Sequence, residues 1–111
     1  MSRFALGDLE HLVLLAFVRL GDESYGVPIL DEIATRTGRP VSRAAVYIAL
    51  RRLEAKGLLR SRLGEATPER GGRAKRYFRI TRAGLRQLQV SRETLVKMWD
   101  HIEARLERGR S

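Results

Sequence analysis

Hydrophobic side chains recur at helical spacing in three segments of the first half of the chain. Residues 9–20, about 24–37 and about 43–56 each carry apolar positions three and four residues apart, which is the pattern of a helix packed on a core. Ser42 is placed to cap the third helix, and a glycine follows each segment, where helices commonly end. Three short helices with tight connections predict a helix-turn-helix core.

The first of these helices is apolar around most of its circumference. Asp8 is expected to cap it, and Leu14, Leu15 and Phe17 lie off the stripe formed by its other apolar residues. A helix on the surface of a small domain cannot bury so wide an apolar surface by itself. A second chain is therefore predicted to cover part of this helix.

The period changes after Gly57 from helical to extended. Residues 58–63 and 74–80 are predicted to form two strands joined by a charged, glycine-rich loop. In the second strand Phe78 and Ile80 are expected to face the core, because alternate side chains of a strand point to opposite faces. The segment is therefore predicted to be a β-hairpin with a long tip.

A single helix capped by Thr81 is predicted to follow and to reach about residues 105–108. Hydrophobic residues along it are spaced 3, 7, 4, 3 and 4 apart, as in a heptad seam: Leu85, Leu88, Leu95, Trp99, Ile102 and Leu106. One small domain cannot cover the seam from Leu95 onward. We therefore expect it to pack against the first helix of a second copy, through a self-complementary two-fold contact.

The predicted homodimer interface has members on both helices: Leu12, Leu15, Leu95, Trp99, Ile102 and Leu106. Trp99 is either a packed anchor of this interface or an aromatic wall of an effector pocket between the subunits. The predicted fold class is mainly α with a two-stranded β-hairpin wing. Residues 1–81 are predicted to form a winged helix-turn-helix, and residues 82–111 a C-terminal dimerisation helix in the same compact unit.

Charge is concentrated in the middle of the chain. Residues 39–82 hold 13 of the 22 Lys and Arg and 3 of the 13 Asp and Glu, a balance of +10, whereas the rest hold 9 basic and 10 acidic residues, a balance of −1. An ordinary solvated surface mixes the two signs, whereas a polyanion-binding face concentrates one of them. The distribution predicts a nucleic-acid partner.

Other classes of function find little support in the sequence. There is no cysteine, and His11 and His101 fall on separate predicted helices without a carboxylate cluster or a nucleophile motif. We therefore expect no enzyme activity, no metal site and no cofactor. The longest apolar run is too short to cross a bilayer, and the N-terminus lacks the pattern of a signal peptide, so a cytoplasmic location is expected.

Two basic surfaces are candidates for contact with nucleic acid. The far side of the third helix carries Ala44, Ile48 and Arg51, flanked by Tyr47 and Arg52, and a helix in a major groove uses such small, apolar and cationic groups. The hairpin tip holds four cations beside two glycines: Arg70, Arg73, Lys75 and Arg76. The alternatives are an ordinary solvated helix and a solvated hairpin tip.

Several motifs, in one order, resemble those of the PadR family of bacterial transcriptional regulators between residues 6 and 88. They are Leu6-Gly7-Asp8-Leu9-Glu10, Tyr25-Gly26, Val46-Tyr47, Arg52-Leu53-Glu54 and Gly71-Gly72-Arg73-Ala74-Lys75-Arg76-Tyr77-Phe78. Departures occur at Ala44-Ala45 and Ile48, where many members have Gly-Thr and Pro. The short tail resembles the compact subgroup with a single C-terminal helix.

The resemblance implies a repressor or other regulator that binds inverted-repeat operators as a dimer, with a response in some members to phenolic acids or planar hydrophobic drugs. The residues expected to bind double-stranded DNA are Tyr25, Ser42, Arg43, Tyr47, Arg51, Arg52, Arg73, Lys75 and Arg76. The main alternative is a basic RNA-binding or ribosome-associated protein, which would prefer structured RNA to duplex DNA. A purely dimeric interaction module is a third reading.

Overall fold

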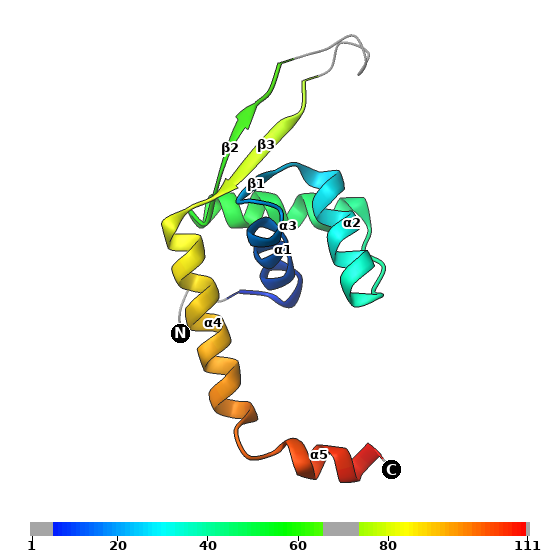
Figure 1. The fold of residues 1–111 in the computed structure, drawn as a ribbon. Helices are drawn as coiled ribbons and strands as arrows, with labels where there is room; N and C mark the ends of the chain where they lie inside the picture. Colours follow the sequence, from blue (N-terminus) through cyan, green and yellow to red (C-terminus); the bar gives the residue numbers. More distant parts are fainter. Residues whose placement is uncertain (1–5, 66–73, 111) are drawn as a thin grey trace.

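The computed structural model describes residues 6–65 and 74–110. These residues form, in order, α1 (Asp8–Arg19), β1 (Glu23–Ser24), α2 (Gly26–Thr37), α3 (Arg43–Ala55), β2 (Leu59–Leu63), β3 (Arg76–Ile80), α4 (Arg82–Trp99) and α5 (Glu103–Arg110). The first three helices pack together, the β2–β3 hairpin rises above them, and α4 leads away below to α5 (Figure 1). The predicted winged helix-turn-helix is confirmed.

α1 lies at the centre of the core. Its side chains Val13, Leu14 and Phe17 have no exposed surface, and the helix contacts α2, α3, α4 and β3. The other elements supply the remaining buried hydrophobic residues outside α1: Ile29, Ile33, Val46, Ala49, Leu50, Leu53, Leu58, Leu59, Phe78, Ile80 and Leu88. The helical and alternating patterns place Ile33, Val46, Ala49, Leu50, Leu53, Phe78, Ile80 and Leu88 inward. Leu58 and Leu59 are neighbours and both buried, which an alternating pattern does not predict.

α1 begins one residue earlier than predicted, with Gly7 and not Asp8 as its N-cap. The buried Glu10 accepts a hydrogen bond from the Gly7 amide at 2.9 Å and another from Lys56 Nζ at 2.7 Å. Because a glutamate at this position reaches back to the capping amide, Asp8 is released into the first turn. There it accepts a hydrogen bond from Arg39 at 2.7 Å.

The other predicted helix caps are confirmed. Ser42 Oγ accepts a hydrogen bond from the Ala45 amide, and Thr81 Oγ1 accepts one from the Gly84 amide, both at 3.0 Å. The Thr81 hydroxyl also donates to the Gly57 carbonyl at 2.8 Å. This hydroxyl therefore ties the start of α4 to the segment that connects α3 with β2.

The wing has three strands at its base and not the two expected. The sequence predicts only a turn over residues 21–24, but β1 pairs antiparallel with β3, and Glu23 lies opposite Arg79. The strand order is β1-β3-β2. A strand of two residues is too short to show an alternating pattern, so β1 can be recognised only from its pairing with β3 in the structure.

The C-terminal segment is two helices, which corrects the prediction of one. α4 ends at Trp99, because Asp100 is extended and His101 is left-handed, with a φ of 66°. The heptad seam is therefore interrupted, with Ile102 in the connecting turn and Leu106 on α5. Helices in proteins are held mostly by tertiary packing, and the side chains around the break are exposed in this single chain.

No helix among the described residues combines the length and the apolar character that crossing a membrane requires.

Glu10→Gln is expected to lower the free energy of unfolding by about 1–3 kcal/mol near neutral pH, because it removes the charge from two hydrogen bonds of a buried side chain. Burial raises the pKa of Glu10, but the hydrogen bonds from Lys56 and Gly7 and the charges of Lys56 and Arg52 bring it below 4.5. Its contribution is therefore present above pH 4.5 and is lost as the pH falls through the lowered pKa. Urea unfolding of both proteins over this range measures it.

The matched control is Glu32→Gln, which removes a surface ion pair with Arg36 four residues away on the same helix. Such pairs contribute about 0.3–0.5 kcal/mol, so this variant should lie close to the wild type at every pH. A stability gap between wild type and Glu10→Gln that stays constant into the acid range would contradict the lowered pKa.

Candidate nucleic-acid interface

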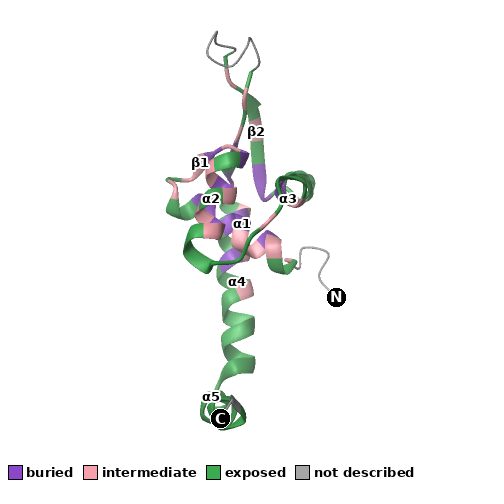
Figure 2. Ribbon diagram, turned by 90° about the vertical axis from the view of Figure 1, so that its right-hand side faces the viewer, coloured by how far each residue is buried: buried purple, intermediate pink, exposed green. Residues whose placement is uncertain are grey.

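α3 turns one side to the core and the opposite side to solvent. Its exposed residues include four of the nine predicted DNA contacts, together with two other residues of the predicted groove-facing side: Arg43, Tyr47, Arg51 and Arg52, with Ala44 and Ile48. In Figure 2 the helix is seen nearly end-on at the edge of the molecule, beside β2, with no other element covering its outer side. Residues 6–65 and 74–110 thus leave this side open to a ligand as large as a duplex.

The solvent side of α3 has two flanks that face different neighbours. On one flank the ring of Tyr47 lies against α2, and its atoms come within 3.0 Å of the place where a Cβ on residue 26 would stand. The ring can pack this closely because Gly26 has no side chain. On the other flank Ile48 and Arg52 line a shallow cleft with the start of α1, and the charge of Arg52 helps to lower the pKa of Glu10. Arg51 projects between the two flanks.

Two arginines on the solvent side of α3 differ in their pairing from several other arginines of the described chain. Within the described part of the chain Arg43 and Arg51 form no ion pair, whereas ion pairs join Arg36 to Glu32, Arg39 to Asp8 and Arg62 to Glu23. An unpaired guanidinium keeps all its donors for an external acceptor. Ser42 has the predicted role of helix cap, so its hydroxyl oxygen already accepts a hydrogen bond within the chain.

Lys75 and Arg76 lie on opposite faces of the hairpin, because neighbouring residues of an extended chain point to opposite sides. Arg76 lies on the face that continues the core, and its Nη1 donates a hydrogen bond to Ser61 Oγ at 3.0 Å. Lys75 lies on the outer face, where its Nζ is 3.9 Å from the centre of the Tyr25 ring. The predicted contacts Arg70 and Arg73 lie outside the described residues.

The outer face of the sheet carries a cluster that the sequence analysis missed. Arg62 donates two hydrogen bonds to Glu23, at 3.2 and 3.3 Å, and stands 4.9 Å from the centre of the Tyr77 ring. Tyr77 in turn meets the Tyr25 ring edge-on at 5.5 Å. The hydrogen bond from Arg62 holds the pKa of Glu23 below its usual range. The alternating pattern of residues 59–62 could have placed Arg62 on the outer face. The pairing of Arg62 with Glu23 could not be predicted, because Glu23 lies on β1, which the sequence does not reveal.

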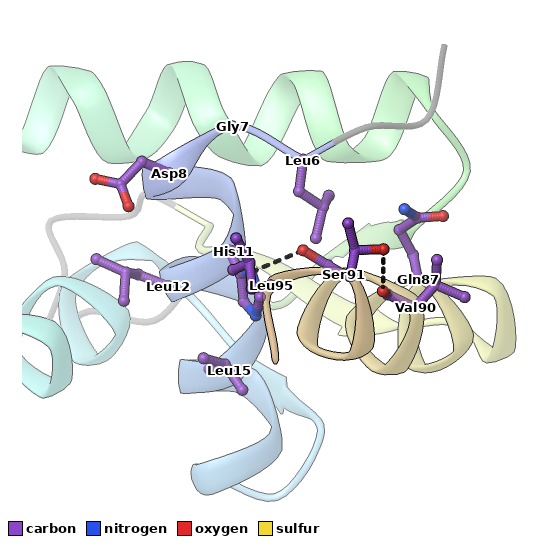
Figure 3. Close-up of a pocket in the computed structure, with 11 residues that line it drawn as sticks. Leu6, Gly7, Asp8, His11, Leu12, Leu15, Gln87, Val90, Ser91 and Leu95 are labelled. Carbon is purple, nitrogen blue, oxygen red and sulfur yellow. Dashed lines mark hydrogen bonds between the residues drawn. The ribbon is translucent and has the colours of Figure 1, made fainter. Parts of the chain in front are cut away.

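A second candidate surface lies between α1 and α4, where His11 and Ser91 form a hydrogen bond of 3.0 Å (Figure 3). Two open clefts, of about 760 and 650 Å³, flank this contact and share His11, Leu15 and Leu95 in their walls. Burial lowers the pKa of His11 below 6.5, against a smaller opposing effect of Asp8. His11 is therefore a packed residue of the helix contact, with its uncharged form favoured.

The clefts bring together four of the six predicted interface residues. One is lined by Leu12, Leu15 and Leu95, and the other by Leu15, Leu95 and Trp99. Ile102 and Leu106 lie past the end of α4 and outside both clefts. The two clefts together form a groove between α1 and α4. Leu95 is 50% exposed and Trp99 is 49% exposed, so this groove is apolar and open in a single chain.

The second half of α4 projects from the core. Figure 2 shows it exposed along its length below the other helices, and Val96 and Met98 on it are 53% and 75% exposed. The radius of gyration is 16.4 Å, whereas a compact domain of this length has about 13 Å. The chain thus carries an extended apolar arm that its own core does not cover.

Comparison with known proteins gives consistent matches. The model of the Transcriptional regulator PadR-like family matches residues 14–90. An uncharacterized protein from Lysinibacillus sphaericus is 31% identical over 99 residues, which are 87% of this chain and 83% of that protein. The crystal structure of a PadR family transcriptional regulator from Eggerthella lenta is 29% identical, with a TM-score of 0.70, over 90% of this chain and 87% of that one.

The fold is also similar to that of a winged-helix DNA-binding protein from STIV. That structure is 20% identical, with a TM-score of 0.64, over 82% of this chain and 90% of the other.

Proposed function

The chain belongs to the PadR-like family of transcriptional regulators, and from this premise we propose that it is a repressor that binds an inverted-repeat operator as a homodimer. In the proposal α3 enters the major groove and the hairpin contacts the neighbouring backbone, which is how winged helix-turn-helix proteins read a duplex. Such a role places the chain in the cytoplasm.

The observation that carries the proposal is the unpaired charge on the solvent side of α3. Arg51 projects from the middle of that side, without an ion pair in the described chain, between Tyr47 and Ile48. Arginine suits the edge of guanine, and an apolar side chain suits the methyl group of thymine. Arg43 at the start of the helix and Arg76 on the hairpin are placed for phosphates. Arg52 is also assigned to the phosphate backbone of the DNA, because it lies on the flank of α3 toward α1.

The homodimer is supported by the open groove and by the projecting arm. Packing α4 of one chain on α1 of another would cover Leu15, Leu95 and Trp99 at once, in a two-fold contact. Two α3 helices could then lie about 34 Å apart, one turn of DNA, as a palindromic operator requires. Trp99 serves as an anchor of this contact. The cleft beside it would also take a planar aromatic effector between the subunits, with the indole as one wall.

Duplex binding should weaken steeply with salt. A dimer that uses several cations on each subunit should give a log-log slope of binding constant against salt with a magnitude of about 5–9, at about 0.9 per phosphate contact. Fluorescence anisotropy with a labelled duplex over a series of salt concentrations measures the slope. A slope near zero, or a salt-resistant preference for structured RNA over duplex DNA, would reject the proposal.

Arg51→Ala should relax sequence preference and weaken operator binding by about 1–3 kcal/mol, whereas Arg76→Ala should weaken binding to all duplexes nearly equally, because phosphates carry no sequence. The operator is first selected by the wild-type protein from a random duplex pool. Affinities of each variant for operator and for random duplex are then compared. Arg36→Ala, on α2 and already paired with Glu32, is the matched control and should change neither. Equal losses on both duplexes for Arg51→Ala would remove this residue from base contact.

Leu95→Asp should shift the protein toward monomer, because it places a charge in the groove that the dimer closes. Lys97→Asp is the control, since it introduces the same residue two positions away, about 200° around the helix. Sedimentation at micromolar concentration gives the state of each protein. The emission of Trp99, the only tryptophan, should move to shorter wavelength as the wild-type chain is concentrated. A monomeric wild type that binds a palindrome tightly would overturn the dimer.

A further inference from the structure

A chain of hydrogen bonds joins α3 to both strands of the wing. Ser61 Oγ on β2 donates to Glu54 Oε2 in the last turn of α3, at 2.5 Å, and accepts from Arg76 Nη1 on β3, at 3.0 Å. A serine hydroxyl can donate one hydrogen bond, and Ser61 donates it to Glu54. Toward Arg76 the Ser61 oxygen can therefore only accept. Hydrogen-bond donation therefore runs in one direction, from Arg76 through Ser61 to Glu54.

These contacts lie where the hairpin leaves the core. Ser61 stands opposite the buried Phe78 in the register, and the next pairs outward on the ribbon carry Arg62 and the 61% exposed Leu63. A two-stranded ribbon is only marginally stable alone and can twist readily. Its angle against α3 thus depends on the side chains that bridge the two, and the hydrogen bond from Ser61 to Glu54 is one such bridge.

The opposite face of the ribbon is held by a separate set of contacts. There Glu23 holds Arg62, and Lys75 lies over Tyr25. The base of the wing is therefore fixed on both faces, but only the Glu54 side acts on Arg76. In the described chain Ser61 is the sole hydrogen-bond partner of Arg76. A guanidinium has five N–H donors, so the others are available to a phosphate.

We propose that Glu54, acting through Ser61, is a positioning residue that aims Arg76 and sets the angle of the wing against α3. The inference rests on the proposed function and adds to it an acidic residue that promotes operator binding. By charge alone a carboxylate beside DNA repels the phosphates, so its removal should strengthen binding to any duplex. By position its removal frees the wing, and operator binding should weaken. The two effects have opposite signs.

The test compares affinities for the selected operator and for random duplex at one salt concentration. Glu54→Ala should weaken binding to operator and to random duplex alike, about 10-fold, the effect of one charge-assisted hydrogen bond, because the Arg76 side chain that it aims contacts phosphates, which every duplex has. Glu54→Gln should recover part of the loss, because its amide oxygen can accept the proton of Ser61. Ser61→Ala should give a similar loss, and the double variant should be no worse than either single one.

Glu65→Ala is the matched control, because Glu65 is an exposed acidic residue at the start of the wing loop. It should raise both affinities by the same factor. The positioning role is overturned if Glu54→Ala also raises both affinities equally, or if losses from Glu54→Ala and Ser61→Ala add. Thermal unfolding checks that each variant is folded, and Ser61→Ala decides the matter if Glu54→Ala is not. If the wild-type protein binds no duplex, the proposed function itself fails, which is a distinct result.

Discussion

The burial of α1 is the constraint on which the rest of the molecule depends. Val13, Leu14 and Phe17 have no contact with solvent, and α2, α3, α4 and β3 all pack on this one helix. α1 sets where α3 presents its outer side and where α4 departs. The same helix leaves Leu15 and Val18 nearly half exposed. Its apolar residues therefore extend beyond the stripe that the core of this chain buries.

Helical and alternating patterns predicted the three core helices, both hairpin strands and the caps at Ser42 and Thr81, because each depends on residues near one another in sequence. β1 was missed, since two residues show no period. The break after Trp99 was missed for another reason. Spacing alone shows that a seam can exist, but not that a helix continues where nothing packs against it.

The candidate site was predictable in part. Charge and spacing identified the outer side of α3, which follows from one helix and its period. The separation of Lys75 from Arg76 was implicit in the alternation of a strand, although both had been assigned to one surface. The Glu54–Ser61–Arg76 chain joins three elements through side chains 7 and 15 residues apart. Contacts of this kind depend on how the elements are placed in space, which no local pattern encodes.

The open groove between α1 and α4 has a consequence for dosage. In the proposed dimer the species that reads the operator forms from two chains, so at low abundance its amount grows with the square of the total chain concentration, by mass action. Operator occupancy would then rise more steeply than the expression of the gene. Operator occupancy would then show a threshold in chain concentration that comes from dimerisation alone, without cooperativity between operators. Substitutions at Leu15 or Trp99 would move that threshold and leave the recognised sequence unchanged.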